Sequence, residues 1–173
     1  MKIEDGQTLL FTGDSITDCE RIYPFGEGAG LGNGYVALVD SLLSAWYPDR
    51  IVRVLNTGIS GNRVIDLEIR WHSDILDYEP DWLSIMIGIN DVWRHFDTIA
   101  NPIQVGIERY ESAYRGILAQ TRSRLKGLVL MTPFFLEKNS SDPMRACLDE
   151  YRGVVKKLVP HTNRCTIYGA LIE

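Results

Sequence analysis

Two hydrophobic patterns alternate along the chain: short apolar runs, and longer stretches in which apolar residues recur three or four positions apart. Short runs that end at Gly, Pro or Asn predict buried strands, whereas the wider spacing predicts amphipathic helices. The run at 82–87 (WLSIMI) is apolar throughout, which is typical of a central strand in a parallel sheet. The predicted strands are 8–12, 51–56, 82–87, 127–132 and 165–171.

Helical spacing fills the intervals between these runs. One helix is predicted over 35–46, a second from Val64 through Trp71 to Ile75, and a third over 107–118. A fourth begins at Asp142 and Pro143, a favourable N-cap and first helical residue, and extends to about 158. Alternating strands and helices predict an α/β fold, a doubly wound parallel sheet in a single domain over 1–173.

A glycine-rich stretch from Gly26 to Gly34 resembles a phosphate-binding loop at first sight. However, Gly28 and Gly30 are followed by Asn33 where the G-x-G-x-x-G pattern needs its third glycine, and no strand leads directly into a helix there. We therefore predict a flexible loop.

Composition and charge argue against several classes of partner and site. The chain of 173 residues suits one domain, and its net charge of −5 without a Lys/Arg run argues against nucleic acid or anionic membranes as partners. No apolar segment is long enough for a membrane span or a secretory leader, so we expect a cytoplasmic protein. Cys19, Cys147 and Cys165 lie far apart without C-x-x-C spacing, so we expect packed hydrophobic residues and neither a disulfide framework nor a zinc site.

Three polar loops follow the first three predicted strands. They read GDS (13–15), N-x-G-x-S-G-N (56–62) and GIND (88–91). The carboxyl ends of parallel strands share one sheet edge, so these loops can converge there. A nucleophilic serine needs hydrogen-bond donors for the developing oxyanion. Taken alone, Ser15 fits a turn, Gly61 a turn glycine and Asn90 a helix cap, but in this order they indicate one catalytic site.

The chain resembles the SGNH, or GDSL, hydrolase superfamily, and most closely its acetylxylan-esterase branch. GDSIT, GISGN and GIND match the first three blocks of that superfamily, and LLFTGDSITDC, NTGISGN and PDWLSIMIGINDVWR are similar to that branch. The resemblance implies a flavodoxin-like, three-layer α/β/α fold. It also implies that Ser15 attacks an acetyl ester of a small carbohydrate such as a xylo-oligosaccharide, while its own N–H, Gly61 and Asn90 hold the oxyanion.

The same resemblance assigns three further residues to substrate binding. Asp14 would order the serine loop, although a plain turn aspartate fits the pattern equally well. Trp93 and Arg94 would line the mouth of the site; the alternative is a packed tryptophan beside a solvated arginine. Related esterases often assemble, which allows a homo-oligomer. The resemblance implies no metal and no cofactor.

The fourth block of the superfamily, D-x-x-H, is not found in these 173 residues. His72, His95 and His161 have Ile69, Val92 and Leu158 at the position where the block has aspartate. The resemblance also weakens from about 159, so we expect a truncated domain whose final helix is missing and whose apolar sheet surface is exposed. Loss of one member of the catalytic triad, here the base, typically leaves only about 10³- to 10⁴-fold catalysis over water.

Three functions therefore remain open at this point. The first is a serine esterase of the SGNH type. The second is a catalytically inactive remnant or sugar-binding protein, which the missing D-x-x-H favours. The third is a flavodoxin-like binder of phosphate or nucleotide, which fits the predicted sheet but lacks a phosphate loop.

Overall fold

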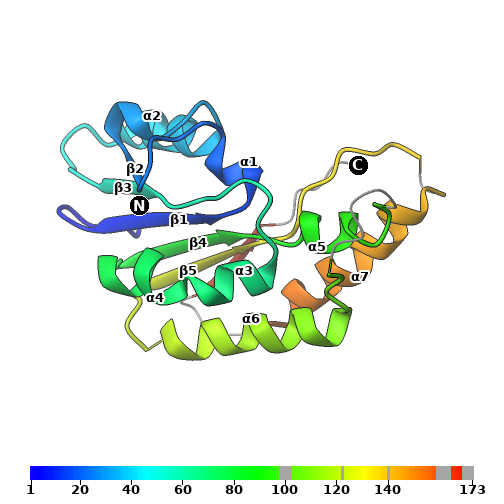
Figure 1. Ribbon diagram of the computed structural model, residues 1–173. Coiled ribbons are helices and arrows are strands. Elements are labelled where there is room, and N and C mark those ends of the chain that lie inside the picture. The colour runs from blue at the N-terminus through cyan, green and yellow to red at the C-terminus, as the bar shows by residue number, and fades with distance from the viewer. Residues whose placement is uncertain (98–102, 122, 140, 159–164, 169–173) are drawn as a thin grey trace.

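The structure of the protein is a computed structural model that describes residues 1–97, 103–121, 123–139 and 141–158, and the backbone of 165–168. Within these residues six strands form one sheet with helices on both faces (Figure 1). The strands are β1 (Thr8–Gly13), β2 (Gly26–Glu27), β3 (Arg53–Asn56), β4 (Trp82–Met86), β5 (Gly127–Met131) and β6 (Cys165–Tyr168).

The strand order across the sheet is β2-β3-β1-β4-β5-β6. Every neighbouring pair is parallel except β2 with β3, which is antiparallel. The five parallel strands follow the flavodoxin-like order, so the predicted doubly wound α/β fold is confirmed. Strand β1 pairs with both β3 and β4, and its end therefore lies between the ends of those two strands.

The helices divide unequally between the two sheet faces. Helix α2 (Tyr35–Trp46) covers one face, while α3 (Val64–Ile69), α4 (Trp71–Asp74), α6 (Ile107–Thr121) and α7 (Pro143–Leu158) lie below the sheet in Figure 1. Strand residues alternate between the faces, as a pleated strand requires. Leu10, Leu55 and Leu83 join the core under the lower helices, whereas Leu9 and Phe11 pack toward α2.

Beside α2 the upper face carries an apolar groove of about 620 Å³. Residues from β1, β4 and β5 form its floor, and the amino-terminal segment and α2 form its sides. The prediction that a missing final helix exposes an apolar sheet surface stays a prediction. Its lining is Lys2, Ile3, Leu9, Phe11, Tyr35, Val39, Trp82, Ser84, Val129 and Met131.

The prediction of one continuous second helix is wrong. The segment divides into α3, α4 and a 3-10 turn, η2 (Leu76–Tyr78). Arg70 separates α3 from α4 because its backbone, at φ −93° and ψ 8°, leaves the helical region. Leu67, Trp71 and Ile75 are nevertheless all buried, which explains why the apolar spacing ran across the break.

The prediction of a flexible loop over 26–34 is also wrong in part. This stretch forms β2 and a 3-10 turn, η1 (Gly28–Gly30), because Gly26 pairs with Asn56 and the carbonyl of Gly30 accepts from Ile22. Two short helices, α1 (Ser15–Asp18) and α5 (Ile89–Trp93), escaped prediction since so few residues show no periodicity. The last strand is observed over 165–168, and 169–171 lie outside the described residues.

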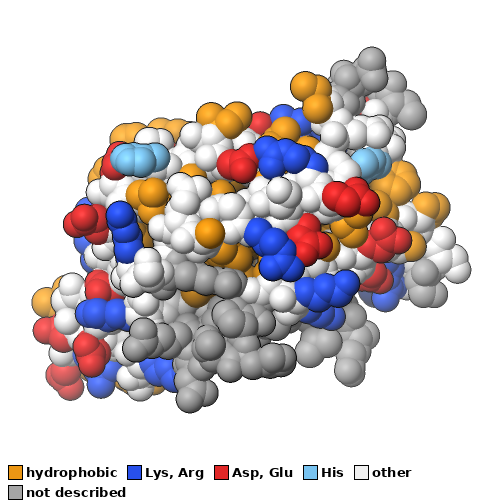
Figure 2. Space-filling model, turned by 90° about the horizontal axis from the view of Figure 1, so that it is seen from below, with side chains coloured by type: hydrophobic (Ala, Val, Ile, Leu, Met, Phe, Trp, Pro, Cys, Tyr) orange, Lys and Arg blue, Asp and Glu red, His pale blue; other side chains and the backbone are white. Residues whose placement is uncertain are grey.

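Acidic and basic side chains are interspersed on the lower face of the molecule, as Figure 2 shows. Ion pairs on this side include Arg115 with Glu111 along α6, and Arg109 with Glu68 between α6 and α3. Among the described helices, none has both the length and the apolar character that crossing a bilayer requires.

Candidate active site

Ser15 is the first residue of α1, two positions beyond the end of β1, and its side chain is exposed. Asp14 caps this short helix, because its Oδ1 accepts from the Ile16 N–H at 3.0 Å. Asp14 is only 1% exposed, and this burial raises its pKa to about 6 against the lowering effect of the Ile16 hydrogen bond. Asp14 thus ties the serine loop to the start of α1, and its assignment to substrate binding stays a prediction.

Gly61 lies in a tight turn that follows β3. The Asn62 N–H donates to the Ile59 carbonyl at 3.2 Å and closes the turn, with Gly61 at φ +81°, where glycine is strongly preferred. The Ile59 N–H in turn donates to the Gly13 carbonyl at 3.1 Å. The end of β1 and the Gly61 turn are thus joined directly through their backbones.

Asp18 fastens the same turn to α1. Its Oδ2 accepts from the Ser60 N–H at 2.9 Å, from the Ser60 hydroxyl at 2.7 Å and from the Tyr23 hydroxyl at 3.0 Å. Burial alone would raise the pKa of Asp18, but the hydrogen bonds from Ser60 and Tyr23 and the Arg21 charge lower it overall. A charged Asp18 therefore holds the residue that precedes Gly61.

Asn90 is buried near the start of α5, directly after β4. Its Nδ2 donates one hydrogen to the Asn62 carbonyl at 2.9 Å, and among the described residues the second amide hydrogen has no acceptor. The next residue, Asp91, accepts from the Val64 N–H through both oxygens at 3.1 Å. Burial raises the pKa of Asp91 to about 7, although the Val64 hydrogen bond acts in the opposite direction.

The structure thus brings the loops of Ser15, Gly61 and Asn90 to one edge of the sheet. The carboxyl ends of β1, β3 and β4 are adjacent there, with α1 and α5 beyond them in Figure 1. Within the described part of the chain, the N–H groups of Ser15 and Gly61 have no hydrogen-bond acceptor. Such free donors beside an exposed hydroxyl are suited to stabilise an oxyanion.

Asn56 holds this edge together from inside. It is the last residue of β3 and is fully buried. Its Nδ2 donates to the carbonyls of Thr17 at 2.7 Å and Leu31 at 2.9 Å, and its Oδ1 accepts from the Gly58 N–H at 2.9 Å. One carboxamide therefore joins α1, the stretch before α2 and the loop after β3.

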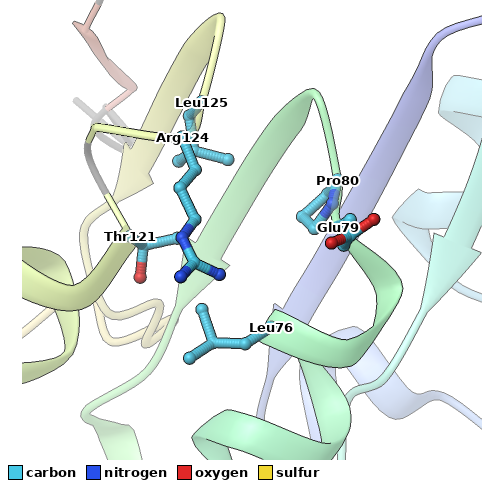
Figure 3. Close-up of a pocket in the computed structure, with 6 residues that line it drawn as sticks. All are labelled: Leu76, Glu79, Pro80, Thr121, Arg124 and Leu125. Atoms are coloured by element: carbon cyan, nitrogen blue, oxygen red, sulfur yellow. The ribbon is translucent and has the colours of Figure 1, made fainter.

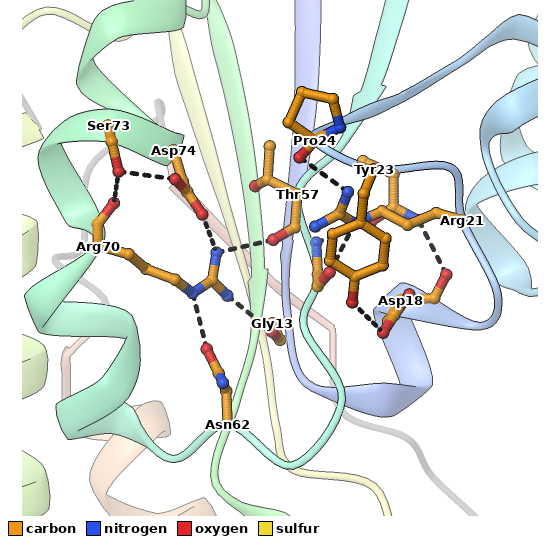
Figure 4. Close-up of polar contacts among 12 residues, drawn as sticks. Gly13, Asp18, Arg21, Tyr23, Pro24, Thr57, Asn62, Arg70, Ser73 and Asp74 are labelled. Atoms are coloured by element: carbon orange, nitrogen blue, oxygen red, sulfur yellow. Dashed lines mark hydrogen bonds and ion pairs between the residues drawn. The ribbon is translucent and has the colours of Figure 1, made fainter.

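Arg70 is a further polar residue of this edge that sequence reasoning missed (Figure 4). It follows α3, yet its guanidinium reaches the backbone of Gly13 and Thr57 and the side chain of Asn62. No local motif marks it, because its partners lie far away in the sequence. Asn62 and Asp91, by contrast, lie within the GISGN and GIND motifs and could have been found there.

Trp93 and Arg94 end α5 near the same edge. The Trp93 side chain is 58% exposed, so the alternative of a packed tryptophan is wrong. Arg94 Nη1 lies 3.2 Å from Asp97 Oδ2, so its charge is paired and not simply solvated. That these two residues line the mouth of the site stays a prediction.

The two histidines with described positions are both engaged elsewhere. His72 is 79% exposed, and its Nδ1 lies 3.1 Å from Asp77 Oδ1. His95 Nε2 lies 3.2 Å from the Val105 carbonyl and 3.1 Å from the Tyr151 hydroxyl. Neither is hydrogen-bonded to Ser15. His161 lies outside the described residues.

A smaller cavity of about 390 Å³ lies at the opposite edge of the sheet, where β4 and β5 begin (Figure 3). Figure 3 shows Leu76, Glu79 and Pro80 across from Arg124 and Leu125. The cavity is lined by residues that precede the strands, so it is separate from the loops that carry Ser15, Gly61 and Asn90.

Comparison with known proteins gives an independent line of evidence. Residues 11–167 match the model of the GDSL-like lipase/acylhydrolase family. An acetylxylan esterase of Geobacillus stearothermophilus is 51% identical over 166 residues, which cover 94% of this chain and 76% of that enzyme.

Solved structures agree with this relationship. The crystal structure of the Geobacillus acetylxylan esterase Axe2 superposes with a TM-score of 0.87 at 52% identity, over 91% of this chain and 73% of that one. LAE5, an α/β hydrolase from the metagenome of Lake Arreo in Spain, gives 0.86 at 42% identity, over 91% and 74%. With a serine loop, a glycine turn and an asparagine joined at the sheet edge where such hydrolases are expected to react, this chain belongs to the GDSL-like lipase/acylhydrolase family.

Proposed function

We propose that this protein is a serine esterase that removes acetyl groups from xylo-oligosaccharides or similar small carbohydrate esters. The observation that carries the proposal is the arrangement at the carboxyl edge, where an exposed Ser15 lies beside the Gly61 turn and Asn90 is bonded to that turn at 2.9 Å. The 51% identity to an acetylxylan esterase supports the acetyl group and the carbohydrate as substrate.

The proposed reaction is acyl transfer through Ser15. Its Oγ attacks the acetyl carbonyl, and the carbonyl oxygen becomes an oxyanion that accepts from the N–H groups of Ser15 and Gly61 and from Asn90 Nδ2. Collapse of this intermediate breaks the ester bond, and the departing sugar oxygen takes up the proton that the Ser15 hydroxyl lost, so that the sugar leaves with a free hydroxyl. Water then attacks the acetyl-serine, which releases acetate and restores the Ser15 hydroxyl.

A serine of the same number supports Ser15 as the nucleophile. One solved structure of Axe2 is a catalytic mutant in which its serine 15 is replaced by alanine. Others are catalytic mutants at a histidine and at an aspartate, both numbered above 173 in that enzyme.

No motif identifies the base that accepts the Ser15 proton, because these 173 residues contain no D-x-x-H. We propose that neither His72 nor His95 replaces it, because both are hydrogen-bonded elsewhere. Without that base the Ser15 hydroxyl is a poor nucleophile, so we expect the Ser15-dependent rate of these residues alone to be low.

An ester assay on p-nitrophenyl acetate and on acetylated xylo-oligosaccharides tests the proposal. Ser15→Ala should remove the enzymatic part of the rate, whereas Ser41→Ala, an exposed serine of α2 bonded to the Ala37 carbonyl, should leave it unchanged. Equal rates for Ser15→Ala and the unmodified protein would overturn the serine mechanism.

The missing D-x-x-H also favours a second candidate, a protein that binds acetylated sugars without turning them over. Calorimetric titration with acetylated xylo-oligosaccharides separates the two functions. Binding that releases no acetate would support the second candidate, and acetate release that depends on Ser15 would exclude it.

A further inference from the structure

We propose that Arg70 is the positioning residue of the oxyanion site, because its guanidinium bonds the end of β1 and the loop after β3 directly and is linked to Asn90 through Asn62. The inference rests on the proposed function for its catalytic consequence, but the geometry can be tested without turnover.

The contacts of Arg70 divide between the loops and a helical carboxylate (Figure 4). Its Nη2 donates to the Gly13 carbonyl at 3.0 Å, its Nη1 to the Thr57 carbonyl at 2.7 Å, and its Nε to Asn62 Oδ1 at 2.7 Å. Nη1 also donates to Asp74 Oδ2 at 2.9 Å. The first three bonds therefore reach the end of β1 and the whole loop after β3.

The third loop is reached through Asn62. The Asn62 side chain accepts from Arg70, while its backbone carbonyl accepts from Asn90 Nδ2 at 2.9 Å. The chain of bonds from Arg70 through Asn62 sets the direction of the Asn90 carboxamide, and with it the direction of the free amide hydrogen. Gly61, whose N–H is a second oxyanion donor, directly precedes Asn62.

Burial makes these bonds necessary for Arg70. Its side chain is 11% exposed, so each N–H that loses its acceptor stays without water to replace it. A guanidinium offers five N–H groups in a rigid plane and can bond several acceptors in fixed directions. Lysine has the same charge on a single nitrogen and cannot reach Gly13, Thr57 and Asn62 together.

The alternative is that Arg70 only stabilises the fold through its ion pair with Asp74. Two variants separate these roles. Arg70→Lys keeps a positive charge that can pair with Asp74 but loses the fork, whereas Asp74→Asn removes the ion pair and leaves the bonds to the loops intact. If Arg70 positions the oxyanion donors, Arg70→Lys should disturb them and Asp74→Asn should not.

The first measurement is NMR of the full chain, following the side-chain amide of Asn90 and the backbone amide of Gly61. Both signals should shift in Arg70→Lys and stay in place in Asp74→Asn. The matched control is Arg152→Lys, an arginine of α7 that also donates to a backbone carbonyl, that of Pro133, and pairs with Asp149. Unchanged Asn90 and Gly61 signals in Arg70→Lys would overturn the inference.

The second measurement is the Ser15-dependent rate on p-nitrophenyl acetate. Arg70→Lys should lower kcat about tenfold with KM within about twofold, because the lost interactions act on the oxyanion and not on the bound ester. An equal loss in Asp74→Asn would assign the effect to the ion pair and overturn positioning.

Two further outcomes keep the proposals distinguishable. If Arg70→Lys fails to fold, Asn62→Ala removes the side chain that accepts from Arg70 and keeps the Asn62 backbone carbonyl to which Asn90 donates. The Asn90 signal should still shift in this variant, and an unmoved signal would overturn the role of Arg70. If Ser15→Ala reacts as fast as the unmodified protein while the NMR signals move as expected, the proposed function fails and the positioning role stands.

Discussion

The two edges of the sheet are built from different kinds of contact. At the carboxyl edge, the buried side chains of Asn56 and Asp91 and the largely buried side chain of Arg70 bond the backbone of residues far away in the sequence. At the amino edge, Asp81 accepts from the Thr8 N–H at 3.0 Å and pairs with Lys126 at 2.9 Å near solvent. Gln7 at the amino edge is also buried and accepts from Trp82 Nε1 at 2.8 Å, so the difference lies in the number of such bonds, which is larger where the loops after β1, β3 and β4 meet.

Among the variants that test this difference between the two edges, Asn56→Ala should lower stability the most. It leaves the Thr17 and Leu31 carbonyls and the Gly58 N–H without their partner in the interior, which should lower the free energy of unfolding by about 3 to 5 kcal/mol. Urea denaturation measures this change. Asn33→Ala, which loses one exposed bond to Glu20, is the matched control and should change stability by less than about 0.5 kcal/mol. A similar small loss for both variants would contradict the contrast.

The pH dependence of stability tests the buried carboxyl of Asp91. Its pKa is about 7 in the folded protein against an ordinary value of 3.8, so the folded state binds the extra proton between these values. Stability from this group is therefore complete below about pH 4 and is lost as the pH rises through 7. Asp14, with a pKa raised to about 6, adds to the same trend.

Asp91→Asn should flatten this decline by about 4 kcal/mol between pH 4 and pH 8, because an amide stays neutral. Urea denaturation across this range gives the profile. Asp149→Asn, at an exposed carboxyl of α7, should keep the profile of the unmodified protein. A decline of unchanged slope in Asp91→Asn would show that the carboxyl is not protonated in the fold.

Gly61→Ala sharpens the comparison within the active-site loop itself. A residue with a side chain is strained at φ +81°, although the added methyl group meets no other atom within 4 Å. We expect a loss of about 1 kcal/mol in stability together with a lower esterase rate, as the turn shifts its N–H. Gly153→Ala, inside α7 and also in open space, should instead stabilise by about 0.5 to 1 kcal/mol. Stabilisation in both variants would mean that the turn tolerates alanine.

The smallest effect is expected at the amino edge. Lys126→Ala removes an ion pair whose lysine is 56% exposed, and such pairs contribute little. The free energy of unfolding should change by less than about 0.5 kcal/mol, measured by the same denaturation. A loss above 2 kcal/mol would make the two edges energetically alike.

Much of the fold was predictable because it depends on local pattern. The apolar runs predicted all five parallel strands, and the spacing predicted α2, α6 and α7. At the site, motifs after strands were sufficient to select Ser15, Gly61 and Asn90. The structure brings their loops together, while their catalytic roles remain proposals.

What could not be predicted depends on contacts between distant residues. Arg70 breaks a helix whose apolar spacing continues across it, and its acceptor Gly13 lies 57 positions away. The hydrogen bond from the Val64 N–H at the start of α3 to Asp91 of α5 is likewise invisible until these two helices are placed together. Single-sequence patterns report burial well, but they do not report which polar group bonds which.

Strand β2 affects how readily a second copy of the molecule can pair with this edge of the sheet. An unpaired sheet edge is a template on which another chain can add a strand. Here that edge is only two residues long and runs antiparallel to β3, and Glu27 forms a bidentate ion pair with Arg53 at 2.8 and 3.0 Å on it. A short, charged border of this kind offers an incoming strand few free backbone groups, so β2 protects this side of the sheet against edge-to-edge aggregation.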